Sequence, residues 1–260
     1  LVAIPDRIGR YRIVRVIGTG AVSTVFEAHD PDLDVPVAVK LLAENWLSRE
    51  DVVGAFLREA RLLRSIEDPR IVAVHDIGTL PSGQPYLVMD LLGGTLDDRL
   101  ATYGPDAEGA VRVGIELCAA LRRVHSAGLV HRDVKPANAF VVSDDAGLFP
   151  VGAGLVVGDF GLASSADHAP VGGTPGYMAP EQQSGAMADA RADIFSIAAV
   201  VERLATGRDG AGALPGPLRD ALDSGLATDP ADRPGSVAEF ARVLEDARQT
   251  SRPGRRSVVV

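Results

Sequence analysis

The string from residue 131 to residue 138, His-Arg-Asp-Val-Lys-Pro-Ala-Asn, concentrates side chains suited to proton transfer and metal binding. Its proline and its many polar residues predict a loop. At these offsets Asp133, Lys135 and Asn138 can present a proton acceptor, a cation and a metal-binding amide together. Farther along, Asp159 follows an apolar segment, so its carboxylate is expected at a strand end, where it could bind a divalent ion. The string Asp-Phe-Gly that begins there also occurs as an ordinary turn, so this chemistry depends on what accompanies it.

A glycine-rich stretch near the start of the chain is suited to phosphate binding. Gly18-Thr19-Gly20 lies between two strand-like segments, which predicts a hairpin turn whose backbone amides can approach a phosphate closely. No helix pattern follows, and no Gly-Lys-Ser/Thr is present, which excludes the two common nucleotide-binding glycine motifs. An ordinary glycine turn explains this stretch equally well. A second glycine-rich stretch, at 152–154, is expected to be a plain hairpin or loop.

Lys40 and Glu59 are expected to form one ion pair. Lys40 ends the apolar strand Val-Ala-Val-Lys, where an unpaired charge would be costly to bury. Glu59 lies within a helical pattern that spans 49–66 and begins near Ser48 and Asp51 with capping-box spacing. A carboxylate on an apolar helix face needs a cation, and Lys40 is one of two lysines among 26 basic residues. The alternative is that the apolar face of the helix is assigned incorrectly and that Glu59 is exposed to solvent. The expected same-face neighbours of Glu59 are Val52, Ala55, Phe56, Leu62, Leu63 and Ile66.

The elements that must position these residues change in kind along the chain. Strand patterns dominate up to about residue 92 and helix patterns follow, which predicts an α+β protein with a small β-rich N-lobe and a larger helical C-lobe. We expect the N-lobe at 8–92, a hinge near 91–94, the C-lobe at 93–249 and a basic tail or linker at 250–260. The expected strands are 11–17, 24–28, 35–42, 71–77, 86–91 and 154–157, and the expected later helices are 107–126, 192–205, 217–227 and 236–247.

Composition excludes several classes of protein. The 260 residues are 46% hydrophobic, which is enough for a substantial core. The net charge of −9 argues against a nucleic-acid partner, because such proteins carry broad basic surfaces. Cys118 is the only cysteine, so no internal disulfide can form, and a reducing cytoplasmic compartment fits best. No signal peptide and no transmembrane-length apolar run is present.

Taken in order, the motifs resemble those of the eukaryotic-type serine/threonine protein kinases. Lys135 and the Gly-Thr-Pro segment at 173–175 resemble serine/threonine rather than tyrosine kinases. The preference for arginine over lysine, and Ser23 where a third glycine is usual, are similar to bacterial members. The resemblance rests on Gly18-Thr19-Gly20, Val37 to Lys40, Glu59, His131 to Asn138, Asp159 to Gly161 and Ala179-Pro180-Glu181.

The resemblance implies a two-lobed fold, ATP with Mg²⁺ or Mn²⁺, and protein substrates phosphorylated on serine or threonine. Asp133 would accept the hydroxyl proton, Lys135 would neutralise charge, and Lys40 held by Glu59 would contact the phosphates. Asn138 and Asp159 would hold the metal ion. Glu181 would pair with Arg233, and Asp193 would brace the catalytic loop. The nucleotide would be bound by Ile17, Gly18, Thr19, Gly20, Val25, Ala38, Lys40, Met89, Asp90, Leu92 and Phe140.

Several alternatives stay open at this point. A pseudokinase that serves as an ATP-binding scaffold and a small-molecule kinase are the rival functions, and a homodimer is compatible with the sequence. Arg252, Arg255 and Arg256 resemble a juxtamembrane cluster, which predicts a membrane tether beyond the C-terminus and the cytoplasmic domain of an anchored protein. A disordered tail explains these arginines equally well.

Regulation by phosphorylation is expected to be weak. Arg132 precedes Asp133, a pairing that commonly holds a phosphate on the following loop. That loop has no hydroxyl residue between 166 and 173, and Ser164 and Ser165 lie too early in it to reach Arg132 in the usual manner. We therefore expect activity to depend little on loop phosphorylation, with Asp167 supplying a fixed negative charge. By resemblance the Thr174 hydroxyl would contact Asp133 and Lys135.

Overall fold

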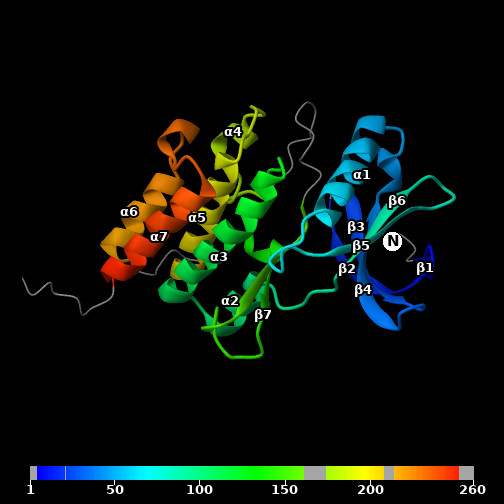
Figure 1. Ribbon diagram of the computed structural model, residues 1–260, viewed down its shortest axis with the longest axis horizontal. Helices are drawn as coiled ribbons and strands as arrows, with labels where there is room; N and C mark the ends of the chain where they lie inside the picture. The colour runs from blue at the N-terminus through cyan, green and yellow to red at the C-terminus, as the bar shows by residue number, and fades with distance from the viewer. Residues whose placement is uncertain (1–4, 21, 161–173, 208–213, 252–260) are drawn as a thin grey trace, which may run out of the picture. The chain divides into compact units, whose positions relative to one another are not determined.

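The computed structural model describes residues 5–20, 22–160, 174–207 and 214–251 (Figure 1). The chain divides into two compact units, an N-terminal one that extends to Gly93 and a C-terminal one that begins at Gly94. The sequence-based boundary fell one residue earlier. Within the described ranges, none of the helices is long and apolar enough to cross a membrane.

The N-terminal unit is a six-stranded antiparallel sheet in the order β1-β2-β3-β4-β6-β5, with helix α1 beside it (Figure 1). Helix α1 packs against β5 and β6. The central residues of strand β4 are buried in succession, so the strand has buried side chains on both faces of the sheet. The bounds are β1 Arg7–Ile8, β2 Tyr11–Thr19, β3 Ser23–Asp30, β4 Val35–Leu42, β5 Val74–Thr79, β6 Pro85–Met89, the 3-10 helix η1 Glu44–Trp46 and α1 Glu50–Arg64.

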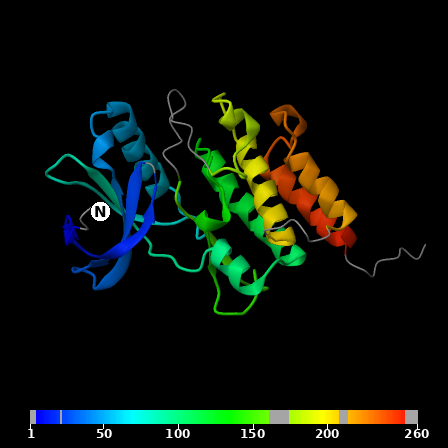
Figure 2. The ribbon, with the colours of Figure 1, turned by 180° about the vertical axis from the view of Figure 1, so that it is seen from behind.

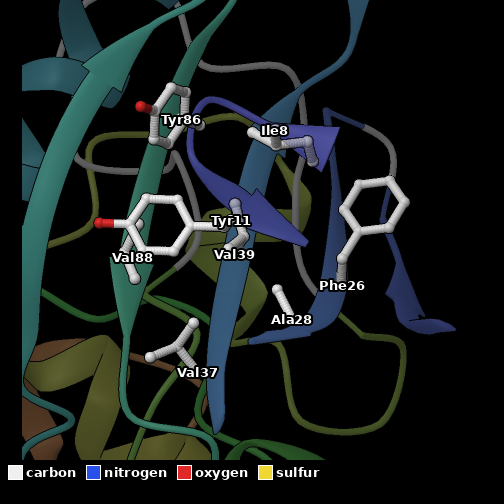
Figure 3. Close-up of a cluster of buried hydrophobic side chains, with 8 residues drawn as sticks. All are labelled: Ile8, Tyr11, Phe26, Ala28, Val37, Val39, Tyr86 and Val88. Atoms are coloured by element: carbon white, nitrogen blue, oxygen red, sulfur yellow. The ribbon is translucent and has the colours of Figure 1, made fainter. Parts of the chain in front are cut away.

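One face of this sheet carries a hydrophobic cluster that includes Val37 and Val39 of β4 (Figure 3). Because side chains alternate along a strand, Lys40 lies on the opposite face from Val39. The Tyr11 and Tyr86 rings meet edge to face at 6.2 Å, and the Tyr11 hydroxyl donates to Asp76 at 2.8 Å. The cluster therefore ties β2 to β5 and β6.

The C-terminal unit is mainly helical, and helix α3 lies at its centre (Figure 2). Helix α3 packs against α5 and α7, and α6 packs against α7. A two-stranded hairpin of β7 and β8 follows the loop that carries Asp133. The bounds are α2 Leu96–Tyr103, α3 Ala107–Ser126, η2 Pro136–Asn138, β7 Ala139–Val142, β8 Gly154–Val157, α4 Pro180–Gln183, α5 Arg191–Thr206, α6 Gly216–Gly225, η4 Pro230–Asp232 and α7 Val237–Ser251.

The structure confirms the expected helices at 107–126, 192–205, 217–227 and 236–247 to within a few residues. The strand expected at 71–77 begins only at Val74. Ile71 and Val72 are buried, which explains their apolar pattern, but they lie before the first residue of β5. Helix α1 has Arg49 at its N-cap with no side-chain cap, so the capping box predicted from Ser48 and Asp51 was wrong. The predicted tail also began too early, because 250 and 251 still belong to α7.

The segment between β7 and β8 packs onto the helices of its own unit. Leu148 and Phe149 are buried. The Arg112 guanidinium of α3 donates to the Phe149 carbonyl at 2.6 Å, and Arg99 of α2 donates to the Asp145 carbonyl at 2.7 Å. The segment therefore adds to the core of the helical unit. The expected hairpin or loop at 152–154 is confirmed.

The close packing of the Tyr86 ring against Gly78 and Gly9 leads to a first prediction. A Cβ atom on Gly78 or Gly9 would collide with the Tyr86 ring. We expect Gly78→Ala to lower the free energy of unfolding by about 1–3 kcal/mol, because the buried ring must shift. Urea unfolding monitored by circular dichroism measures this change.

Gly216→Ala is the matched control, since a Cβ there meets no neighbouring atom. Equal stability of the two variants would contradict the close approach of Gly78 to Tyr86.

Candidate functional site

The glycine stretch of the N-terminal unit forms the predicted hairpin between β2 and β3. Gly18 lies opposite Val25, and Thr19 lies opposite Thr24 in the antiparallel ladder. The Gly20 amide donates to the Ser23 carbonyl at 2.9 Å. Ser23, which stands where a glycine is usual, is the first residue of β3, and its carbonyl accepts the hydrogen bond that closes the turn.

Lys40 and Glu59 are both buried charges in the N-terminal unit. Each is 4% exposed, and neither lacks an interaction partner. Lys40 lies between Val25 of β3 and Leu87 of β6 in the sheet. Glu59 lies on the buried face of α1 with most of its predicted neighbours, but Leu62 is 37% exposed, so its predicted place on that face was wrong. Ala60 is buried on α1 instead.

The end of β6 is held by a contact that the sequence did not suggest. The Asp90 carboxylate accepts from the backbone N–H of Ala73 at 3.3 Å and lies 2.7 Å from His75 Nε2. The Asp90 N–H donates to the Ala73 carbonyl at 3.1 Å, so the carbonyl oxygen is the backbone group that Asp90 can offer to a ligand. Next to it, Met89 lies opposite Ala38 in the sheet.

In the C-terminal unit Asp133 is the centre of a compact hydrogen-bonded cluster. Lys135 Nζ lies 2.7 Å from Asp133 Oδ2 and 2.8 Å from Thr174 Oγ1. The Thr174 hydroxyl donates to Asp133 Oδ1 at 3.2 Å, which confirms the contacts expected for Thr174. Asn138 Nδ2 donates to the carbonyl oxygen of Asp133 at 2.9 Å and to its Oδ2 at 3.1 Å.

The backbone of this loop is fixed by the buried carboxylate of Asp193 in the first turn of α5. Asp193 accepts from the backbone N–H of His131 at 2.9 Å and of Arg132 at 2.8 Å, which confirms the predicted bracing role. The His125 ring, which sequence reasoning missed, lies 2.7 Å away from the carboxylate. Burial alone would raise the pKa of Asp193, but the hydrogen bond from His125 and the other groups facing the carboxylate outweigh it and lower the pKa.

His131 supports the same loop from inside. It is fully buried, and burial lowers its pKa although the carboxylates of Asp193, Asp133 and Asp159 act in the opposite direction. A neutral imidazole can accept a hydrogen bond, and His131 Nδ1 accepts from the Asp133 N–H at 3.3 Å. Its ring lies 4.4 Å from the Phe160 ring, centroid to centroid.

The β7–β8 hairpin brings the two predicted metal-binding residues to neighbouring positions. The Gly158 N–H donates to the Asn138 carbonyl at 2.9 Å, and Asp159 follows with a left-handed φ of 50°. Because Asn138 Nδ2 is committed to Asp133, its Oδ1 is the atom that it can offer to a cation. No group of three or more His, Cys, Asp or Glu suited to a metal occurs in the part of the chain that the structure describes. An amide oxygen, a carboxylate and ligand phosphates still form a suitable donor set for Mg²⁺.

An ion pair that the sequence predicted anchors the region after Thr174. The Arg233 guanidinium donates to the Glu181 carboxylate through its two terminal nitrogens, Nη1 at 2.7 Å and Nη2 at 2.8 Å. Its remaining N–H groups donate to the carbonyls of Ala227, Arg191 and Thr228. A buried arginine is costly unless its donors are satisfied, and all five are used here.

Comparison with known proteins identifies the family. Residues 11–211 match the family model described as the protein kinase domain. The chain therefore belongs to the protein kinase domain family. The kinase domain of Mycobacterium tuberculosis PknI, solved as a double mutant, superposes with a TM-score of 0.74 at 28% identity, covering 95% of this chain and 100% of that one. This likeness confirms the α+β protein kinase fold.

Several relatives of this kinase domain are bacterial serine/threonine-protein kinases. Pkn1 of Myxococcus xanthus is 38% identical over 78% of this chain and 29% of its own length. PknJ of Mycobacterium tuberculosis is 36% identical over 91% of this chain and 45% of its own length. The chain thus spans less than half the length of these curated relatives.

The predicted site residues of the kinase domain fall on both units. The C-terminal unit brings Asp133, Lys135 and Asn138 into contact with one another. Within the N-terminal unit Ala38 and Met89 are buried, and Ile17 is exposed. The predicted residues Ser164, Ser165, Asp167, Arg252, Arg255 and Arg256 lie outside the described residues.

The Asp193 carboxylate generates a pH-dependent prediction. In Asp193→Asn the backbone amides of His131 and Arg132 lose a charged acceptor, so the free energy of unfolding at pH 7 should fall by about 1–3 kcal/mol. Because its pKa is lower in the folded than in the unfolded chain, Asp193 stabilises the fold fully above its ordinary value of 3.8. That stabilisation is lost as the pH falls through the lower, folded-state pKa.

Urea unfolding of both proteins from pH 7 to pH 3 measures this effect. The difference between wild type and variant should shrink at the acid end. A difference that stays constant or grows with acid would contradict the lowered pKa.

Proposed function

We propose that this chain is a serine/threonine protein kinase that transfers the γ-phosphate of ATP to serine or threonine hydroxyls of protein substrates. The observation that carries the proposal is the cluster in which Asp133 contacts Lys135, Thr174 and Asn138 at 2.7 to 3.2 Å. This cluster combines a carboxylate with the cation and the hydroxyl that can orient an incoming hydroxyl group. The names of the bacterial relatives support the same activity.

In this proposal Asp133 is the proton acceptor. The substrate hydroxyl donates to the Asp133 carboxylate, and its oxygen attacks the γ-phosphorus as the proton moves to Asp133. The bond from the γ-phosphorus to the oxygen that bridges it to the β-phosphate breaks, and ADP leaves with that oxygen. Lys135 Nζ, already 2.7 Å from that carboxylate, neutralises negative charge beside the transferring group. ATP would supply the phosphoryl group, and a bound divalent cation would neutralise negative charge on its phosphates.

The N-terminal unit supplies the nucleotide-binding half of the proposed site. Lys40, held by Glu59, contacts the α- and β-phosphates, and the hairpin at Gly18, Thr19 and Gly20 covers them. Since the Gly20 amide already donates to Ser23, the other amides of the turn provide the phosphate contacts. Within this unit Ile17, Val25, Ala38, Met89 and Leu92, with the carbonyl of Asp90, would hold the adenine. Phe140, which the sequence also assigned to the nucleotide, belongs to the C-terminal unit.

A divalent cation completes the proposed site. Asn138 through its Oδ1 and Asp159 through its carboxylate would hold Mg²⁺, which takes oxygen ligands and keeps few protein contacts. Mn²⁺ accepts the same ligands. Neither ion changes the role proposed for Asp133.

Two rival functions fit the site less well. A pseudokinase scaffold has no need for the full set of Lys40, Glu59, Asp133, Asn138 and Asp159, all of which are present. A small-molecule kinase has no need for the contact between Thr174 and Asp133, since by the family resemblance Thr174 belongs to a segment that positions a peptide substrate. Phosphorylation of a protein acceptor therefore explains more of the structure.

Three further hypotheses concern features beyond this cluster. The basic residues at 252–256 would precede a membrane tether, which would make the domain the cytoplasmic part of an anchored protein. A homodimer is the second hypothesis. Weak dependence on phosphorylation of Ser164 and Ser165 is the third, and phosphatase treatment followed by initial-rate assays tests it.

The proton acceptor gives the first functional prediction. Asp133→Asn removes the acceptor charge, so phosphoryl transfer should fall by about 10²–10⁴-fold while ATP affinity is retained. Incubation with γ-labelled ATP, Mg²⁺ and a generic acceptor protein, with phosphosite mapping on chain and acceptor, measures the transfer.

Asp223→Asn on the exposed side of α6 makes the same chemical change away from the loop and should leave the rate unchanged. Unimpaired transfer by Asp133→Asn would refute the mechanism, and label confined to free phosphate would refute protein phosphorylation.

The second functional prediction concerns Lys40 and Glu59. If they pair, removal of either partner leaves a buried charge whose cost is on the order of 3–5 kcal/mol. Lys40→Met and Glu59→Gln should each lose activity and stability. The double variant should lose much less than the sum, because the second change removes the charge that the first left unpaired. Initial rates and unfolding free energies of the four proteins complete this cycle, and strictly additive losses would argue against contact.

A further inference from the structure

The peptide group between Arg132 and Asp133 is held at both ends by side chains. Its carbonyl oxygen, that of Arg132, accepts from Gln182 Nε2 at 3.0 Å. Its N–H, that of Asp133, donates to His131 Nδ1 at 3.3 Å. The preceding N–H of Arg132 donates to Asp193. The orientation of this peptide plane is therefore set by two side chains, those of Gln182 and His131, and Asp193 fixes the plane before it.

This orientation matters because Arg132 has a left-handed backbone. Its φ of 64° is unfavourable for a residue with a Cβ atom and persists only where the surroundings determine it. Rotation of the plane changes ψ of Arg132 and φ of Asp133 together. Since φ of Asp133 sets the direction of its Cα–Cβ bond, the hydrogen bond from Gln182 influences where the carboxylate points.

Gln182 is itself fixed at its other atom. Its Oε1 accepts from the Ala179 N–H at 3.2 Å, so its amide bridges the start of α4 and the catalytic loop. Reversal of the amide would place its nitrogen against an N–H and its oxygen against a carbonyl, so both contacts agree on one assignment. Helix α4 is anchored in turn by the buried pair of Glu181 and Arg233.

We infer that Gln182 is a positioning residue for phosphoryl transfer, one that orients Asp133 through the Arg132 carbonyl without touching the substrate. The inference rests on the proposed role of Asp133 as proton acceptor. A displacement of about 1 Å at a reacting group can cost on the order of 100-fold in rate. Loss of this hydrogen bond should therefore act on turnover and leave nucleotide affinity unaltered.

The adjacent Gln183 provides a matched control. It lies on the same short helix, and its Nε2 donates to the Met178 carbonyl at 2.8 Å, away from the loop. Gln182→Met removes the hydrogen bond to the Arg132 carbonyl and the one from the Ala179 N–H, and Gln183→Met removes the one to the Met178 carbonyl, with the same change of shape. Gln182→Glu keeps the acceptor for Ala179 and replaces the donor to Arg132 with a carboxylate oxygen that faces the same carbonyl.

Initial rates at varied ATP, melting temperatures and amide hydrogen exchange of residues 131–133 should be measured for wild type and the three variants. We expect kcat to fall about tenfold or more in both Gln182 variants, with KM for ATP unchanged and wild-type kcat for Gln183→Met. Amide exchange at 132 and 133 should be faster only in the Gln182 variants. A fall in melting temperature without a kcat difference between the two methionine variants would mean a merely structural role.

The proposed function and this inference fail in different ways. An inactive wild type would refute the proposed kinase activity, and the exchange rates would still decide whether Gln182 holds the peptide. An active wild type with equal kcat and equal exchange in Gln182→Met and Gln183→Met would overturn the inference alone. Full activity of Gln182→Glu would overturn the donor role.

Discussion

The buried carboxylate of Asp193 is the constraint on which the candidate site depends. A carboxylate without solvent contact must be compensated, and here two backbone amides and the His125 ring supply the compensation. The amides belong to His131 and Arg132, so satisfying Asp193 forces the backbone before Asp133 into one conformation. The left-handed φ of Arg132 follows from this requirement. The catalytic loop is thus shaped by the need to solvate a buried charge.

The two kinds of basic residue serve different purposes in this chain. Arg233 uses five donors in a planar fork to join Glu181 to three carbonyls, an arrangement that a lysine could not reproduce. Lys40 and Lys135, the only lysines, stand where a compact charge beside phosphate is proposed. Arginine therefore builds the support of the loop, and lysine is kept for the proposed chemistry.

The sequence predicted most of the candidate site because its motifs resemble those of a known family. That resemblance implied the contacts of Asp133 with Thr174, of Glu181 with Arg233 and of Asp193 with the loop, which join residues far apart in the sequence. His125, His75 and Gln182 were missed, because their partners are backbone groups or residues brought close only by folding. One feature of the sequence pointed to Gln182. It lies three residues after Ala179, the N-cap of a helix that begins with proline, and a glutamine at that position can bond back to the N-cap backbone. Leu62 was misplaced because helical periodicity cannot show how far the partner sheet extends.

The hydrogen bonds that surround Asp133 all come from within the C-terminal unit, and this has an energetic consequence. Polar groups that must turn toward a reacting centre at every catalytic cycle add a reorganisation energy to the barrier. In this loop the polar groups are ordered once, when the helical unit folds, so that energy is not added at each cycle. The rate and the local stability of the loop are then coupled, so heating that loosens the contacts of Asp193 would slow turnover well below the temperature at which the fold is lost.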